Sequence, residues 1–285
     1  MTFSIVACAP DRRSWGVAVA SKYLAAGGLV PAVEAGAGAL ATQSFLNVGY
    51  RPQGLALLRA GLTAAQVVAA LTAADEGRAH RQLGVVDAAG GAATFTGEEC
   101  MDWAGGRSGR GYAIQGNILT GPEVVAAMEE AWMAPAGDDR GASQFALARR
   151  LLAALAAGDD AGGDRRGRQS AALVVVGLDG VIGEGPGRGQ GADVVVDLRA
   201  DDHAEPVAEL RRLLGLADLY FGKPDPATLL PLEGELAAEV DGRLRALGYD
   251  SLEAWAGVEN YEERLVEGSI DPVVLAKLRE ASPPT

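Results

Sequence analysis

The chain contains 285 residues, of which 48% are hydrophobic and 22% are charged, and it carries a formal net charge of −13 at pH 7. This composition is that of a soluble globular protein with enough apolar residues for one large core and a small second one. The longest apolar stretches, residues 151–157 and 171–176, are far shorter than the roughly 20 residues that span a bilayer, so we expect no membrane partner. The excess of acidic side chains argues against a nucleic-acid partner.

The first residues lack a basic region followed by an apolar run, so no secretory signal is expected and the protein is predicted to be cytoplasmic. Cys8 and Cys100 are not part of a CxxC pattern, which fits two buried thiols in a reducing compartment. The sequence has only two histidines, His80 and His203. We therefore expect neither a metal site nor a cofactor.

Residues 1–203 contain strands and helices in alternating groups. The turn-forming residues 10–13 separate two β-rich segments, which predicts an N-terminal hairpin, and Thr63 is a plausible N-cap for a following helix. The predicted strands are residues 2–7, 15–21, 30–35, 38–43, 83–87, 92–96, 112–115, 171–177, 181–184 and 194–198. The predicted helices are residues 52–60, 64–74, 123–132 and 144–157.

The order of these elements is strands, two helices, strands, two helices, strands. It differs from the strict βαβ alternation of a parallel doubly wound sheet. Two antiparallel sheets between layers of helices would satisfy it. The sequence therefore predicts an α+β domain with a four-layer αββα sandwich.

From about residue 204 onward the strand pattern ends and short amphipathic helices follow. These helices are predicted at residues 206–221, 233–247, 252–255, 261–266 and 272–279. The same segment is strongly acidic, since residues 201–285 carry 18 acidic and 8 basic side chains. We therefore predict a separate all-α domain at residues 204–285, with a boundary at residues 198–203.

The N-terminal hairpin suggests a nucleophile. If its turn centres near Arg12, Thr2 lies opposite Lys22 within about one residue. Lys22 is the only lysine among the first 222 residues, and its ammonium would lower the pKa of an α-amine on Thr2. Once Met1 is removed, that amine can serve as the base for the Thr2 hydroxyl. The alternative is an ordinary protein that begins Met-Thr and has an exposed hairpin lysine.

Several segments of residues 2–200 resemble the family called domain of unknown function 1028. They are TFSIVA (2–7), GVAVASK (16–22), ALATQ (39–43), QGNIL (115–119) and GGDRRGRQS (162–170). That family is placed in the N-terminal-nucleophile hydrolase superfamily, so the resemblance implies the αββα sandwich of proteasome β-subunits and a threonine that opens the first strand. The usual lysine of that superfamily lies on a later strand than Lys22.

The C-terminal segment is similar to a small domain described as peptidoglycan-binding. The similarity is carried by LGY (247–249), Trp255, ENYEER (259–264) and IDP (270–272). A strongly negative surface would repel anionic wall polymers. We therefore interpret this domain as a docking or oligomerisation module, which predicts a homo-oligomer, and keep ligand binding as the alternative.

Further candidate site residues lie in loops that follow strands. A glycine-rich loop with three arginines offers guanidinium groups that can clamp a substrate carboxylate, or it is simply a solvated charged loop. Gln43 and Asn47, at the end of the predicted strand 38–43 and just beyond it, can donate hydrogen bonds to an oxyanion, or they cap a helix. Gln115 and Asn117, which precede the predicted helix at residues 123–132, are candidates to line the pocket. In chain order these candidates are Gln43, Asn47, Gln115, Asn117, Asp164, Arg165, Arg166, Arg168, Gln169 and Ser170.

Together these observations predict an amide hydrolase in which the Thr2 hydroxyl attacks and its α-amine moves the proton. The arginine-rich loop favours a small, carboxylate-bearing amide or peptide-like substrate. The alternative is a catalytically inactive protein of the same fold that binds a metabolite or a cell-wall fragment, or that oligomerises.

Overall fold

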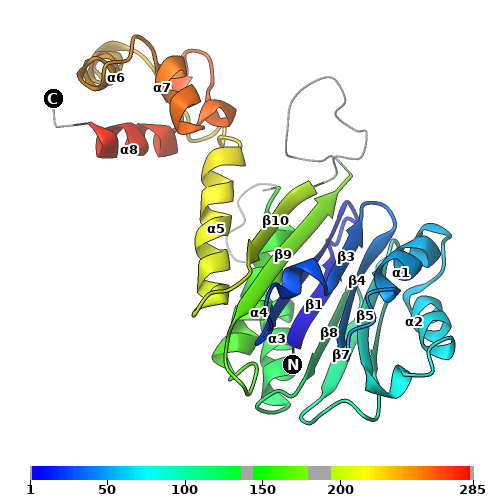
Figure 1. Ribbon diagram of the computed structural model, residues 1–285. Helices are drawn as coiled ribbons and strands as arrows, with labels where there is room; N and C mark the ends of the chain where they lie inside the picture. The colour runs from blue at the N-terminus through cyan, green and yellow to red at the C-terminus, as the bar shows by residue number, and fades with distance from the viewer. Residues whose placement is uncertain (1, 136–143, 179–193, 283–285) are drawn as a thin grey trace. The chain divides into compact units, whose positions relative to one another are not determined.

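The computed structural model describes residues 2–135, 144–178 and 194–282 (Figure 1). The chain divides into two compact units, one up to Leu214 and one from Gly215 onward. The division lies within helix α5 (Pro206–Phe221), later in the chain than the boundary predicted at residues 198–203. The first half of α5 has buried apolar side chains, Val207 and Leu210 among them, and belongs to the first unit.

A six-stranded antiparallel sheet forms the larger layer of the first unit. Its strand order is β10-β9-β2-β1-β8-β7. The strands are β1 (Thr2–Cys8), β2 (Ser14–Ser21), β7 (Gly105–Gly109), β8 (Tyr112–Asn117), β9 (Ser170–Gly177) and β10 (Val194–Ala200). The predicted hairpin is confirmed, because β1 pairs with β2 from Phe3–Ala20 to Cys8–Trp15. On its other edge β1 pairs with β8, so β1 lies in the interior of the sheet.

A second antiparallel sheet of four strands faces the first. It consists of β3 (Pro31–Glu34), β4 (Gly38–Ser44), β5 (Arg81–Asp87) and β6 (Ala92–Thr96), in that order. Strands β4 and β5 contact β1 and β8 of the larger sheet. Small and β-branched side chains fill the space between the sheets, with Val6, Val17 and Val19 from one sheet packed on Ala39 and Val86 from the other.

Helices cover the outer faces of both sheets. On the six-stranded sheet, α3 (Glu123–Met133) packs on β8, and α4 (Ala146–Asp160) packs on β1 and β2. On the four-stranded sheet, α1 (Tyr50–Arg59) packs on β4, and α2 (Ala64–Ala73) packs on β5 and β6. As predicted, Thr63 caps α2, and it does so through a capping box with Gln66. The first unit therefore combines α-helices with β-sheets, and the mixed helix-and-strand composition predicted from the sequence is confirmed.

The alternation of side chains along β1 separates two environments. Phe3 lies near α4, at Gly158, whereas Val6 and Cys8 belong to the core between the sheets. Because side chains on a strand alternate between its faces, Thr2 and Ser4 also point toward the space between the sheets. Two hydroxyl groups thus enter an interior that is otherwise apolar along this strand.

The second unit is mainly helical. It contains α6 (Gly234–Leu247), α7 (Leu252–Glu259), α8 (Pro272–Ala281) and a short β-pair of β11 (Leu230–Pro231) with β12 (Ser269–Ile270). Trp255 packs against Tyr261 in the core of this unit, with ring centroids 5.4 Å apart. Arg264 is buried beside the core and donates to Asp271 at 2.7 Å and to the carbonyls of Leu219 and Asp218.

Three predicted features differ from the structure or lie outside it. Strand β7 falls in a Gly/Arg-rich segment where no strand was predicted. Residues 261–266 were predicted to be helical, but only the 3-10 turn η3 (Glu262–Arg264) forms there. The strand predicted at residues 181–184 lies outside the described residues.

No helix in the described ranges is both long enough and apolar enough to cross a membrane.

The Arg264–Asp271 pair should stabilise the second unit. Changing Asp271→Asn keeps the shape of the side chain but leaves the buried Arg264 guanidinium without its counter-charge, at a cost of about 3 kcal/mol. Amide hydrogen exchange in α7 and α8 of the full chain measures this loss as a lower free energy of opening. As a control, Lys277→Gln removes an exposed pair with Glu280 and should leave the free energy of opening almost unchanged. Equal effects from the two variants would contradict this role of Asp271.

Candidate functional site

Thr2 is the first residue of β1 and is buried, with 7% of its surface exposed. Its Oγ1 lies 3.1 Å from Oγ of Ser21, the last residue of β2. On the other side of β1, Thr2 pairs with Asn117, the last residue of β8. Thr2 therefore sits where three neighbouring strands end or begin, with its hydroxyl held against a second hydroxyl.

The pairing register places Ser21, and not Lys22, across from Thr2. Facing residues of β1 and β2 have numbers that sum to 23, so the turn centres between Asp11 and Arg12 and the predicted register is shifted by one residue. Lys22 follows the end of β2 and is exposed, and its ammonium donates to the carbonyl of Arg168 at 3.1 Å. The predicted Thr2–Lys22 pair is thus corrected to Thr2–Ser21.

Buried amide side chains surround the backbone of Thr2. Nε2 of Gln43 donates to the Thr2 carbonyl at 3.1 Å and to Oε1 of Gln82 at 2.8 Å. Asn117 donates to the same Gln82 oxygen at 2.9 Å. Gln82 in turn donates to the carbonyl of Gly116 at 2.7 Å. These contacts join β4, β5 and β8 to the start of β1.

The network continues one step along β1. Ser4 donates to Oε1 of Gln43 at 2.7 Å and accepts from Nε2 of Gln115 at 2.6 Å. Gln43, Gln115 and Asn117 were predicted from the sequence, and the structure brings all three together near Thr2. Their amide N–H groups donate to protein oxygens, so the geometry gives them a positioning role. Gln82, Ser4 and Ser21 were missed. Ser4 interrupts a strand of mostly small and apolar residues, and Ser21 ends one, whereas Gln82 stands directly before the predicted strand at residues 83–87.

The arginine-rich loop lies beside the ends of β2 and β8. Buried Asp164 accepts from the backbone N–H of Lys22 at 2.7 Å, and Leu119 forms a β-bridge with Asp164. The backbone N–H of Arg165 donates to the carbonyl of Ile118, the residue that follows Asn117. The loop is therefore anchored to two of the strands that converge on Thr2.

The side chains of this loop have different partners. Arg168 is ion-paired with Asp159 and Glu205, and Arg166 with Asp164. Gln169 donates to Asp202, and Ser170 links the carbonyl of Tyr23 to the N–H of Ala26. The guanidinium of Arg165 is exposed and has no hydrogen bond or ion pair within the part of the chain that is described. Arg165 is thus the arginine most available to an anionic substrate.

Asn47 belongs to a different cluster. Its amide donates to Asp75 at 3.1 Å, and its Oδ1 accepts from the N–H of Gly49 at the start of α1. Tyr50 and Arg81 also donate to the Asp75 carboxylate. The hydrogen bond from Arg81 is the main cause that holds the pKa of Asp75 well below its usual range, and the bond from Asn47 adds to it. The Asn47 side chain therefore supports the start of α1, the alternative weighed for it above.

A family model described as "Family of unknown function (DUF1028)" matches residues 2–210. The chain belongs to this family. A second model, described as "Putative peptidoglycan binding domain", matches residues 220–278, so the similarities noted in both parts of the sequence are confirmed. The crystal structure of protein SPO2555 from Silicibacter pomeroyi, of the same family, is 32% identical, with a TM-score of 0.63 over 83% of this chain and 92% of that one. No curated protein matches the chain.

The amide network makes Gln43 a structural requirement of the site. Replacing Gln43→Leu keeps the approximate size but removes the donor to the Thr2 carbonyl and the acceptor for Ser4, so we expect a loss of about 2 to 4 kcal/mol in the free energy of unfolding. Urea denaturation measures it. The matched control, Gln169→Leu, removes one exposed hydrogen bond to Asp202 and should cost less than about 1 kcal/mol. A Gln43 variant as stable as the control would contradict the role given to the network.

The Asp75 cluster predicts a pH dependence of stability. Its carboxyl pKa is lower in the folded chain than the unfolded value near 4. The stabilisation is therefore present above that unfolded value and is lost as the pH falls through the folded one, so the free energy of unfolding should decline below about pH 5. Asp75→Asn should be less stable at neutral pH and show a shallower acid decline. Asn47→Ala, which keeps the carboxylate and Arg81, should retain most of the slope. Identical slopes for the wild type and Asp75→Asn would contradict the prediction.

Proposed function

We propose that this protein is an N-terminal-nucleophile amide hydrolase with Thr2 as the nucleophile. The observation that carries the proposal is the position of Thr2, which opens an interior strand with its hydroxyl in contact with Ser21 between two facing sheets. Helices on the outer face of each sheet agree with the four-layer αββα sandwich that the family resemblance implies. A threonine that opens the first strand is the expected nucleophile of that arrangement.

The reaction requires that Met1 be removed, because an amide nitrogen is not a base whereas a free α-amine is. The α-amine takes the proton from Oγ1 as this oxygen attacks the amide carbonyl of the substrate. The amine then gives the proton to the leaving nitrogen, and an acyl ester remains on Thr2. Water, activated by the same amine, hydrolyses the ester and restores the enzyme.

The amine must be neutral to act as a base, and its ordinary pKa is about 8. The ammonium of Lys22 was expected to lower this value, but its hydrogen bond to Arg168 leaves burial as the better-supported cause. Thr2 is largely removed from solvent, and burial disfavours the charged form of an amine. The hydroxyl of Ser21 adds a partner that can hold Oγ1 in position.

The substrate proposed is a small amide or peptide-like compound that carries a carboxylate. Arg165 supports this choice, because its exposed guanidinium lies in the loop anchored beside Asn117 and Lys22 and can bind a carboxylate through two parallel hydrogen bonds. The proposed reaction needs no metal, cofactor, nucleic acid or membrane. We further propose that the protein is a homo-oligomer of the cytoplasm.

The second candidate is a catalytically inactive protein of this fold that binds a ligand or assembles with partners. The match of residues 220–278 to a domain described as peptidoglycan-binding favours it. In that case the second unit recognises a cell-wall fragment, and Thr2 serves only to close the end of the sheet.

An intact-mass measurement followed by hydrolysis assays on a library of small amides tests the proposal. We expect Met1 to be absent, Thr2→Ala to lose activity by a factor of at least about 1,000, and Thr2→Ser to keep part of it. Arg165→Gln should raise KM for carboxylate-bearing amides with little change in kcat.

Two controls separate the candidates. Ser44→Ala changes a half-buried hydroxyl at the end of β4 and should leave turnover unchanged. An uncleaved N-terminal extension, which blocks the α-amine, should abolish turnover while circular dichroism stays unchanged. Retention of Met1, or equal turnover by Thr2→Ala and the wild type, would overturn the catalytic proposal in favour of the second candidate.

A further inference from the structure

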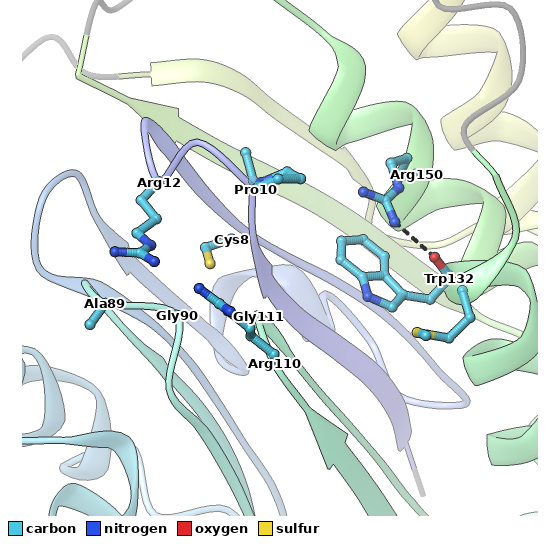
Figure 2. A pocket seen from close by; sticks show the side chains of 11 residues that line it. Cys8, Pro10, Arg12, Ala89, Gly90, Arg110, Gly111, Trp132 and Arg150 are labelled. Carbon is cyan, nitrogen blue, oxygen red and sulfur yellow. Dashed lines mark hydrogen bonds between the residues drawn. The ribbon is translucent and has the colours of Figure 1, made fainter.

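A cavity of about 290 Å³ lies at the end of β1 that is opposite to Thr2. It is formed by the β1–β2 turn, the β5–β6 turn, the β7–β8 turn and the facing parts of α3 and α4 (Figure 2). Its volume is close to the lower limit of small-molecule sites. Thr2 and Cys8 are the two ends of a seven-residue strand, so this cavity is about 20 Å from the proposed nucleophile.

The charged residues that line this cavity are all arginines: Arg12, Arg110 and Arg150. Within the described residues, the guanidinium groups of Arg12 and Arg110 have neither a hydrogen bond nor an ion pair, and both side chains are exposed. The nearby carboxylate of Asp87 accepts three backbone N–H groups, from Ala64, Ala89 and Gly91, and is not part of the lining. A strongly acidic chain thus concentrates three positive charges around one hollow.

Backbone hydrogen bonds hold the three turns together. The N–H of Cys8 donates to the carbonyl of Gly111 at 3.0 Å, and the N–H of Gly111 donates to the carbonyl of Gly90 at 2.9 Å. Gly90 and Gly111 have positive φ angles, and a Cβ on either would meet Sγ of Cys8 within 3.6 Å. Burial raises the pKa of this thiol, so Cys8 adds no negative charge to the wall. The turns therefore present Arg12 and Arg110 from a fixed backbone.

The opposite wall is built by Trp132 and Arg150. The Arg150 guanidinium lies 4.2 Å from the centre of the Trp132 ring and donates to the Trp132 carbonyl at 2.8 Å (Figure 2). Stacking on the ring and this single hydrogen bond fix the plane of the guanidinium while leaving other N–H groups for a ligand. In the view of Figure 2, Cys8 lies between this pair and Arg12.

We propose that this cavity binds a small organic polyanion through Arg12, Arg110 and Arg150. Guanidinium groups bind phosphate and carboxylate oxygens in pairs, and three of them match a ligand with at least two negative charges. The volume limits the ligand to a compact molecule, and the apolar surface of Met133 and Trp132 contacts its carbon atoms. The site is separate from Thr2 and does not depend on the reaction proposed there.

Isothermal titration calorimetry on the full chain tests the site with inorganic pyrophosphate and with citrate, and uses glycerol as an uncharged control. Pyrophosphate represents phosphate ligands and citrate represents carboxylates. We expect at least one of the two to bind, and binding to weaken as ionic strength rises. The double variant Arg12→Gln/Arg110→Gln should lower the affinity by at least about tenfold, since each lost charge-assisted hydrogen bond weakens binding.

The matched control is Arg78→Gln/Arg211→Gln, which removes the same charge from two exposed arginines that do not line the cavity. It should change the affinity less than about twofold. Thr2→Ala should bind as the wild type does, even if the hydrolase proposal fails. The proposal is overturned if the wild type binds neither anion, or if the two double variants lose affinity equally.

Discussion

The double pairing of β1 is the constraint on which the rest of the structure depends. With β2 on one edge and β8 on the other, β1 has no free edge and no exposed face. Its register therefore sets which side chains meet at both of its ends. Thr2 meets Ser21 and Asn117, and Cys8 meets the turns at Gly90 and Gly111. A one-residue slip would turn Thr2 and Ser4 toward α4 and bring Phe3 between the sheets.

The hydroxyls of Thr2 and Ser4 lie in an otherwise apolar interface and need hydrogen-bond partners, and buried amide side chains bring such partners to this region. Buried polar groups without partners are costly, so a network is stable only when nearly all its members are satisfied. Gln43, Gln82 and Gln115 supply donors and acceptors from three different strands. The network couples the two sheets where the proposed nucleophile lies. It holds the Thr2 backbone through the Thr2 carbonyl, while the Thr2 hydroxyl contacts the neutral hydroxyl of Ser21.

Local patterns predicted most of the elements, because their signals lie within a few residues. The hairpin of β1 and β2, the capped helix α2 and the long helix α5 follow from alternation, turn residues and helical spacing. Strand β7, with the sequence GGRSG, has no such signal and exists only because β8 offers it a partner. The amide cluster has a similar origin: Gln43 and Gln82 are 39 residues apart, and only the stacking of strands brings them together. The one-residue error at Lys22 arose because the turn length decides the register, and periodicity alone does not specify it.

Because Ser21 and not Lys22 lies across from Thr2, an N-terminal threonine would be activated in a different way from the one predicted. An ammonium beside the α-amine would lower its pKa by repulsion, whereas a hydroxyl has no charge and acts only by orientation. Desolvation must then provide the shift, and it requires that Thr2 stay buried in a site that also admits substrate. Excision of Met1 would convert the first nitrogen of β1 from an amide into a base and would leave Thr2 as the end of the chain. The buried amides would keep the Thr2 backbone in register through this change, because their hydrogen bonds go to the Thr2 carbonyl and not to its amino group.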